Sequence, residues 1–376
     1  MQPGSRAIMA MFTHDDRQAL TDALTRLLTD HAGEAEVRRV METPEGYDPQ
    51  LWRRLSEMGV VGLIIDESYG GGGAGPVELE RVMEVAGSAL LCGPLISSGV
   101  LAAGLVQALG DEGQKNRWLP KLADGTCIAT AALTGPGGGW TQTDVGVTAQ
   151  AAGPSWRLSG QAAFVTHGQI AELILVVART NTGIGVFAVE AGAEGLTSAA
   201  LPTFDHTLRL ADLTLADVMA ERLGGDAWPA VERVLDLARV ALAGEQAGAT
   251  RHCLTQTVDY AKTRIQFGRP IGGFQAIKHM AADLLLESES AISAARHAAQ
   301  ALADGGPEAP AAVSLAAFAC ADAFVTTAAT SIQMHGGIAF TWAHPAHLYL
   351  RRARADAQLL GTPAFYRERY VQQLAG

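Results

Sequence analysis

Basic residues are scarce in this 376-residue sequence. It contains 28 Lys and Arg residues against 39 Asp and Glu residues, which gives a net charge of −11. Nucleic acids and anionic membrane surfaces both require basic patches on the proteins that bind them. We therefore expect neither nucleic acid nor a membrane among the partners. A small anionic ligand is still compatible with this charge, because it needs only local cations.

Cysteines are few, and long apolar runs are missing. The four cysteines, Cys92, Cys127, Cys253 and Cys320, lie too far apart for a Cys-x-x-Cys arrangement. No uncharged apolar run reaches the roughly 18 residues of a membrane helix, and residues 1–12 lack the apolar core of a secretion signal. These absences predict reduced thiols in a cytoplasmic protein.

The pattern of apolar residues indicates three regions, in the order helical, β and helical. Hydrophobic residues make up 48% of the chain and charged residues 18%, so a large core is expected. Residues 1–125 show helical spacing, interrupted by a glycine-rich stretch at 70–75. No strand–turn–helix unit with a downstream Lys follows this stretch, so we expect it to connect helices rather than bind phosphate.

The middle and last regions differ in the length of their apolar segments. Residues 126–225 contain short strand-like runs separated by turn residues, which predict an antiparallel β domain. These runs lie at 128–133, 145–152, 156–165, 173–178, 185–189 and 208–213. Residues 226–376 contain four long helical segments, at 231–264, 274–303, 309–336 and 345–360, which predict a four-helix bundle.

The most informative stretch lies at 260–283, where a Phe-Gly-Arg-Pro turn interrupts two helices. It resembles the Arg-x-Gln-Phe-Gly-x-Pro-Ile-x-x-Phe-Gln signature of the acyl-CoA dehydrogenases, as does the order of the three regions. The resemblance implies an α+β fold and a surface that holds the adenylate and pyrophosphate of FAD bound mainly by a neighbouring subunit. The matching residues are Arg264, Gln266, Phe267, Ile271, Phe274 and Gln275.

Two further motifs match the cofactor residues of that family. In 332–337 two glycines allow close approach of a ligand to the backbone, and the resemblance assigns Gln333, Met334, Gly336 and Gly337 to a neighbour's FAD. At the end of a predicted strand, Phe164 and Thr166 match an aromatic residue and a hydroxyl that contact the flavin ring. Leu133, Thr134 and Thr362 complete the residues that the resemblance assigns to the cofactor.

The chain departs from the family at 132–141. The family pattern there is Leu-Thr-Glu-Pro-x-Ala-Gly-Ser-Asp, whose backbone amides and Ser contact the flavin and its pyrophosphate. Here the Glu is replaced by Gly135, the Ser by Trp140 and the Asp by Thr141. The tryptophan removes a donor and adds bulk, so this half of the flavin site is expected to be damaged.

The catalytic base of the family is also missing. Dehydrogenation of an acyl-CoA requires a carboxylate to remove the α-proton of the thioester. The resemblance places this carboxylate at Leu360 or at Ala238, and neither accepts a proton. Glu245 lies two helical turns after Ala238 on nearly the same face. Three roles are open for Glu245: a displaced base, a buried polar group bonded to another helix or a ligand, or a surface residue.

These retained and lost residues lead to one prediction and two alternatives. The chain is predicted to be the base-lacking subunit of an α2β2 acyl-CoA dehydrogenase, with a second acyl-CoA dehydrogenase subunit as partner. The resemblance implies FAD as cofactor, an acyl-CoA substrate from lipid or steroid degradation, and an electron-transferring flavoprotein as acceptor. The first alternative is a homo-oligomeric flavoenzyme that uses Glu245 as its base, and the second is a scaffold without catalysis. His279, His335 and His344 lack metal-ligand spacing and are expected to be structural.

Overall fold

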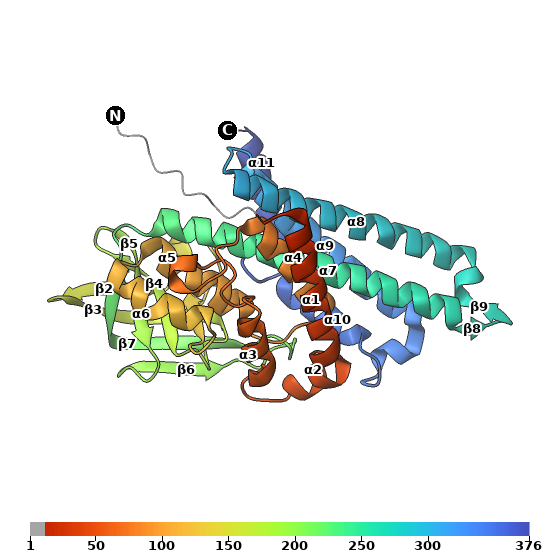
Figure 1. Cartoon of the computed structure of the whole chain (residues 1–376), viewed down its shortest axis with the longest axis horizontal. Coiled ribbons are helices and arrows are strands. Elements are labelled where there is room, and N and C mark those ends of the chain that lie inside the picture. The colour runs from red at the N-terminus through yellow and green to blue at the C-terminus, as the bar shows by residue number, and fades with distance from the viewer. Residues whose placement is uncertain (1–11, 376) are drawn as a thin grey trace.

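The computed structural model describes residues 12–375 and confirms the order helical, β and helical (Figure 1). The N-terminal helices are α1 (His14–His31), α2 (Glu34–Val40), α3 (Pro49–Glu57), α4 (Pro76–Ser88), α5 (Ala103–Leu109) and α6 (Glu112–Ala123). Several begin at a side-chain cap that the sequence supplies. Asp48 accepts hydrogen bonds from the first turn of α3, and Asp111 forms a reciprocal capping box with Gln114 in α6.

The β domain is one seven-stranded sheet. Its strands are β1 (Ala129–Ala132), β2 (Val147–Ala152), β3 (Ser155–Thr166), β4 (Leu173–Thr180), β5 (Gly183–Glu190), β6 (Leu196–Ala200) and β7 (Leu210–Leu223). Most pairs are antiparallel, as predicted, but β1 runs parallel to β4. β5 pairs with both β4 and β7, so the sheet curls back on itself. β6 was not predicted, because its side chains are mostly exposed and carry no apolar alternation.

The C-terminal region contains the four predicted helices and one more. These are α7 (Trp228–Thr263), α8 (Gln275–Asp304), α9 (Ala309–His335), α10 (Ala346–Asp356) and α11 (Pro363–Ala375). α7 begins beside the β domain and extends along the molecule to the short hairpin of β8 (Ile265–Gln266) and β9 (Arg269–Pro270) (Figure 1). The predicted last helix, 345–360, ends earlier, at Asp356, and α11 follows it.

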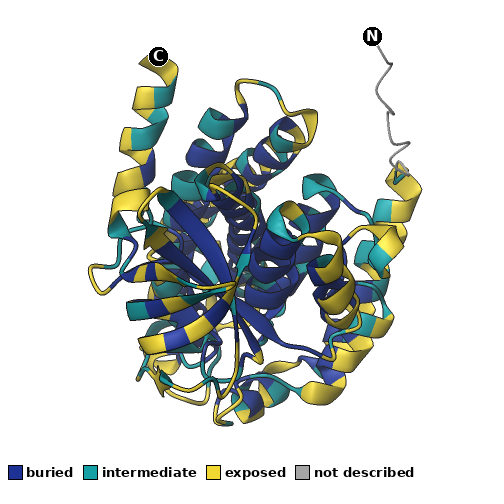
Figure 2. Ribbon diagram, turned by 90° about the vertical axis from the view of Figure 1, so that its left-hand side faces the viewer, coloured by how far each residue is buried: buried dark blue, intermediate teal, exposed yellow. Residues whose placement is uncertain are grey.

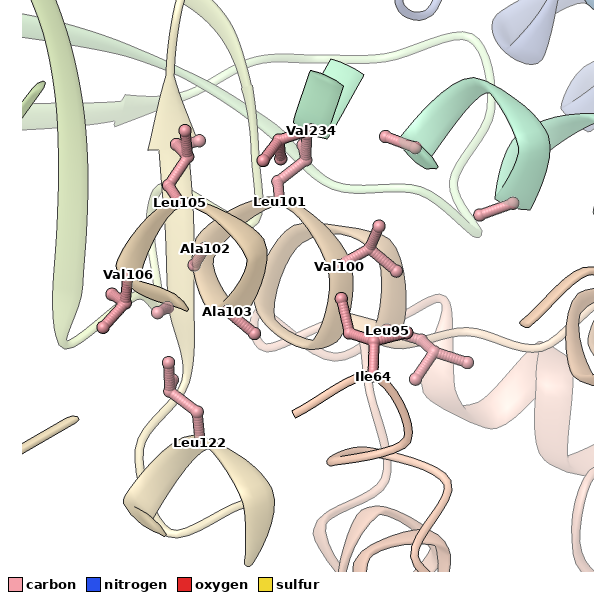
Figure 3. Packing of buried hydrophobic residues seen from close by; sticks show 14 of the residues in the cluster. Ile64, Leu95, Val100, Leu101, Ala102, Ala103, Leu105, Val106, Leu122 and Val234 are labelled. Atoms are coloured by element: carbon pink, nitrogen blue, oxygen red, sulfur yellow. The ribbon is translucent and has the colours of Figure 1, made fainter. Parts of the chain in front are cut away.

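The largest apolar core joins the N-terminal helices, the sheet and α7. Its centre is η2 (Leu95–Ala102), a buried π-helical segment that leads into α5. Figure 3 shows Leu101 of this segment beside Val234 of α7, and Figure 2 shows that the elements inside the molecule are buried on most sides. Because η2 packs on both β1 and α7, it fixes the sheet relative to the bundle.

One helical stretch among the described residues, Ala309–Phe340, has the length and apolar character of a membrane span. Its apolar residues serve the bundle, because 56% of the most apolar window is buried inside the protein. α9 contacts α7, α8, α10 and α11, as expected of a core helix. Such a helix is weak evidence for a membrane.

Candidate functional site

The predicted cofactor surface lies at the end of α7, where the chain turns back into α8. Phe267 and Gly268 have φ values of 51° and 79°, and the Ile271 N–H donates to the Arg264 carbonyl at 2.8 Å, so the turn is closed. Phe267 is 92% exposed. Within the described chain, the Arg264 guanidinium is exposed and makes no ion pair or side-chain hydrogen bond. A cation held at a rigid turn without a partner suits an anionic ligand.

The second cofactor motif lies at the same end of the bundle. The Tyr260 hydroxyl of α7 donates to the His335 carbonyl at 3.3 Å, and the two rings lie with centroids 4.4 Å apart at an angle of 30°. Gln333 and Gly337 are exposed beside this contact. Nothing lies within 4 Å of the position of a Cβ on Gly336 or Gly337, so the backbone here is accessible. Met334 is the exception, because its side chain is buried.

Large apolar side chains are exposed around these two motifs. They are Ile265, Phe267, Ile338, Phe340 and Trp342. Arg269 stacks on the Phe274 ring, 4.1 Å from its centroid, and Gln275 lies within hydrogen-bond distance of His279, at 2.8 Å. A group of exposed aromatic and aliphatic residues of this size marks an interaction surface rather than ordinary solvent-facing surface.

The predicted flavin residues of the sheet are brought together, but the space between them is almost filled. Leu133, Thr134, Phe164 and Thr166 line one enclosed cavity with Trp140 and Leu360. Its volume is about 10 Å³, whereas ligand pockets usually enclose roughly 300–1,000 Å³. Thr362 lies outside this cavity, where its hydroxyl accepts a hydrogen bond from the N–H of Phe365 at the start of α11.

The loop that departs from the family folds onto Asp144. The Gly135 N–H donates to the Asp144 carbonyl at 2.8 Å, and the Thr141 N–H donates to the Asp144 carboxylate at 2.9 Å. A Cβ on Gly135 would lie 2.8 Å from the Asp144 carbonyl oxygen, and one on Gly139 would lie 2.2 Å from the Asp144 carboxyl carbon. The glutamate that the family has in place of Gly135 therefore does not fit this loop.

Both positions of the family's catalytic base are part of the apolar core. Ala238 is fully buried, and Leu360 is 1% exposed with a φ of 61°. Beside them, the Arg239 guanidinium donates to the Tyr366 hydroxyl oxygen at 2.6 Å and to Asp236 at 2.6 Å. No carboxylate replaces the lost base at either position.

Glu245 is buried and bonded to another helix, which is the second of the three roles open to it. Its carboxylate pairs with the Arg352 guanidinium of α10. Arg352 also donates to Asp205 at 3.0 Å and to the hydroxyl and carbonyl oxygens of Thr207 at 2.8 and 3.0 Å. Arg352, Asp205 and Thr207 were not predicted from the sequence, because no local pattern links Arg352 to residues more than 100 positions away.

Comparison with known proteins shows the family to which the chain belongs. Family models of the acyl-CoA dehydrogenase N-terminal, middle and C-terminal domains match residues 14–126, 130–218 and 225–374. The chain belongs to the acyl-CoA dehydrogenase family. Members of this family are FAD-dependent oxidoreductases. The chain is 36% identical over 350 residues to the acyl-CoA dehydrogenase IpdE2 of Mycobacterium tuberculosis. The matched residues cover 93% of this chain and 94% of that protein.

Two solved acyl-CoA dehydrogenase structures are similar over nearly their whole length. The Tcur3481–Tcur3483 steroid ACAD shares 31% identity with a TM-score of 0.87, covering 96% of this chain and 98% of that one. The ChsE4–ChsE5 complex of Mycobacterium tuberculosis shares 29% identity with a TM-score of 0.89, covering 96% and 98%. Both similarities support the fold and the family assignment.

The two halves of an acyl-CoA dehydrogenase cofactor site fit FAD differently in this chain. The surface around Arg264, Gln333 and Gly337 is exposed, carries a free cation and presents accessible backbone, so it fits the adenylate and pyrophosphate part. The sheet surface at Thr134 and Thr166 has an enclosed volume of about 10 Å³ and a loop closed by Asp144, so it does not fit a flavin ring.

The histidines near the cofactor motifs have local hydrogen-bond partners. His335 Nδ1 lies 2.7 Å from the Ser331 carbonyl oxygen, and His344 Nδ1 accepts a hydrogen bond from the Ala346 N–H at 3.2 Å. Burial lowers the pKa of both rings, so both are neutral at pH 7. No group of three or more potential metal ligands occurs within residues 12–375.

Proposed function

We propose that this chain is the base-lacking subunit of a heterotetrameric acyl-CoA dehydrogenase. Its bundle end completes the FAD site of a second, base-carrying subunit. One observation carries the proposal: both base positions, Ala238 and Leu360, are buried apolar residues. Arg264, which has no ion-pair partner among the described residues, remains exposed on the surface that would contact a partner. The half-site that serves a neighbour is kept, and the half-site that serves the chain's own chemistry is lost.

The contacts of Glu245 argue against the homo-oligomeric alternative. A catalytic base must lie within hydrogen-bond reach of the proton that it removes from the α-carbon of the substrate. Glu245 is instead held by Arg352. Releasing it would leave a buried guanidinium with one fewer counter-charge, which is strongly unfavourable. Glu245 therefore serves as a structural partner of α10.

The chemistry of the complex follows from the family. When bound, FAD would supply the acceptor for the hydride from the β-carbon of the acyl-CoA, and an electron-transferring flavoprotein would take up the electrons. In this chain, Arg264 neutralises the pyrophosphate of the partner's FAD, and Gln333 and Gly337 contact its adenylate. The substrate is an acyl-CoA of lipid or steroid degradation, which the similarity to the Tcur3481–Tcur3483 steroid ACAD supports. The four buried free cysteines agree with a location in the cytoplasm.

The test is the FAD content of the chain alone and with its partner. The chain is expressed alone and together with the product of an adjacent gene that encodes a second acyl-CoA dehydrogenase, and protein-bound FAD is measured per chain. We expect little FAD in the chain alone and one FAD per pair in a complex of two chains of each kind. A homo-oligomer of this chain with one FAD per subunit would contradict the proposal. A complex that is colourless in every preparation would favour the scaffold.

A further inference from the structure

Two buried residues, each with a polar atom that has no partner among the described residues, line the same small cavity. Among the described residues, His167 Nε2 and Asp356 Oδ2 are both buried and have no hydrogen-bond partner. Each residue is only 2% exposed. Both line a cavity of about 30 Å³ together with Ser97, Thr166 and Glu245. Buried polar atoms are rarely left unbonded in folded proteins, so these two atoms are candidates to bond a polar group in the cavity.

The cavity is next to the flavin-facing side of the sheet. It shares Ile96, Thr166 and Leu359 with the 10 Å³ cavity that Phe164 and Leu360 line. Its walls include the apolar residues Met83, Leu91 and Leu95. A volume of this size accepts a single water molecule or a group of similar size, but not a longer chain.

The groups around the cavity leave no free charge for a ligand. Arg352 is fully paired with Glu245, Asp205 and Thr207. Burial, with the nearby Glu245 carboxylate as the second cause, raises the pKa of Asp356 well above its ordinary value, which favours the neutral form of this carboxyl. Burial also lowers the pKa of His167 to about 3, so its ring is neutral. An ionic ligand would therefore be buried without a counter-charge, which is costly.

The hydrogen bonds of His167 determine which atom the site accepts. Ser97 Oγ lies 3.2 Å from the Pro94 carbonyl, which accepts its proton, and 3.1 Å from His167 Nδ1. When Ser97 gives its proton to the Pro94 carbonyl, His167 Nδ1 must be the donor to Ser97, and Nε2 is then an acceptor. In its neutral form Asp356 is a donor. The group between them must donate to one and accept from the other. Water and an alcohol hydroxyl do both, whereas a ketone or carboxylate cannot donate.

We propose that His167 and Asp356 form a subsite for a single neutral hydroxyl oxygen at the closed end of the cavity beside Thr166. The oxygen comes either from an ordered water or from the alcohol group of an acyl-CoA that enters this chain. The subsite does not depend on the heterotetramer, because all its residues belong to one chain.

The first experiment is a crystal structure of the purified protein without acyl-CoA, as wild type and as His167→Phe. We expect an oxygen within about 3.2 Å of His167 Nε2 and of the Asp356 carboxyl in the wild type, and none in His167→Phe, which lacks the acceptor. Asp356→Asn serves as the control, because it keeps a donor and the shape of the side chain and should retain the oxygen.

The second experiment distinguishes the two sources. Binding of 6-hydroxyhexanoyl-CoA and hexanoyl-CoA is compared by titration calorimetry in wild type and Asp356→Leu. A preference of about tenfold for the hydroxylated compound, lost in Asp356→Leu, assigns the site to a ligand hydroxyl. The site is assigned to a structural water if the crystal shows an ordered oxygen and the two compounds bind equally or not at all. A cavity without density, combined with no preference for the hydroxyl, overturns the proposal.

Discussion

The Tyr366 hydroxyl donates a hydrogen bond to the carbonyl oxygen of Leu360, the residue that replaces the family's C-terminal base. The same hydroxyl accepts from Arg239, the residue next to the second lost base position. Tyr366 therefore links, through hydrogen bonds, the two parts of the chain in which the family has its catalytic carboxylate. It also holds Leu360 at a φ of 61°, a left-handed conformation that a leucine rarely adopts.

We predict that Tyr366→Phe destabilises the fold. The change leaves the buried Leu360 carbonyl without its donor, and an unsatisfied buried polar group costs about 1–3 kcal/mol. Denaturant unfolding of the chain measures this directly. Tyr370→Phe is the matched control on the same helix, because Tyr370 makes an aromatic contact with Phe318 and should lose little. Equal stability of the two variants would contradict the role of Tyr366.

Two glycines, Gly135 and Gly137, test whether the loop that folds onto Asp144 is closed. A Cβ on Gly135 would lie 2.8 Å from the Asp144 carbonyl, whereas a Cβ on Gly137 would meet nothing within 4 Å. We expect Gly135→Ala to lower the free energy of unfolding by about 1–3 kcal/mol through overpacking. Gly137→Ala should change it by less than about 0.5 kcal/mol. Thermal unfolding of both variants side by side provides the measurement, and equal effects would show that the loop opens.

Glu80 is expected to make stability depend on pH. Its side chain is buried, both carboxylate oxygens lack hydrogen-bond partners within the described chain, and burial raises its pKa to about 7. The folded state therefore binds a proton more tightly than the unfolded state, whose pKa is near 4.5. This contribution to stability is present below pH 4.5 and is lost as the pH rises to about 7.

The replacement Glu80→Gln removes this titration. We expect the variant to be more stable than wild type at pH 8, by up to about 3 kcal/mol, because the pKa of Glu80 rises from 4.5 to about 7 on folding. The difference should shrink towards pH 4.5. Unfolding by urea at a series of pH values measures it, and Glu232→Gln, on an exposed face of α7, serves as the control. A constant difference at all pH values would exclude titration of Glu80 as the cause.

Arg264 tests the cofactor surface. If it neutralises the pyrophosphate of a partner's FAD, Arg264→Ala should weaken FAD binding to the assembled complex about ten- to a hundredfold, as expected for a charge-assisted hydrogen bond. The fold should not change, because the side chain is exposed. Lys262→Ala is the control, since Lys262 is an exposed cation at the same helix end that pairs with Asp259. Equal FAD affinity in both variants would show that Arg264 does not contact the cofactor.

The fold was largely predictable because local patterns determine it. The long helices carry helical apolar spacing, and every sheet strand except β6 is buried along one face or over much of its length. β6 escaped prediction because its side chains are mostly exposed and show no alternation of apolar and polar residues. The parallel pairing of β1 with β4 was also missed, since direction depends on where β1 enters the sheet.

The site was predictable only where residues are close in sequence. The turn at Arg264 and the glycines at 336–337 are local motifs, and they lie at one end of the bundle. The pairing of Glu245 with Arg352 joins residues 107 positions apart, and the closure of the loop by Asp144 depends on backbone contacts. No spacing rule specifies such contacts, so the sequence left three roles open for Glu245.

Replacement of Glu245 tests whether this chain performs chemistry itself. Glu245→Gln removes the charge that faces Arg352, and breaking a buried pair in this way typically costs about 3–5 kcal/mol. Asp205 still faces Arg352, at 3.0 Å, so we expect a loss at the lower end of this range. Stability and turnover must therefore be measured separately, the second on complex that is folded and loaded with flavin.

In the proposed heterotetramer, turnover of the folded Glu245→Gln complex should stay within a few-fold of wild type, because the partner supplies the base. Replacing the partner's own catalytic glutamate should abolish it. In a self-sufficient enzyme Glu245→Gln should itself abolish turnover while FAD stays bound, since proton abstraction needs an ionisable carboxylate near the α-carbon. The paired variants thus separate a structural from a catalytic role for Glu245. A loss of about a thousandfold from Glu245→Gln alone, with FAD still bound, would make this chain the catalyst, because that exceeds the effect of a lost structural contact.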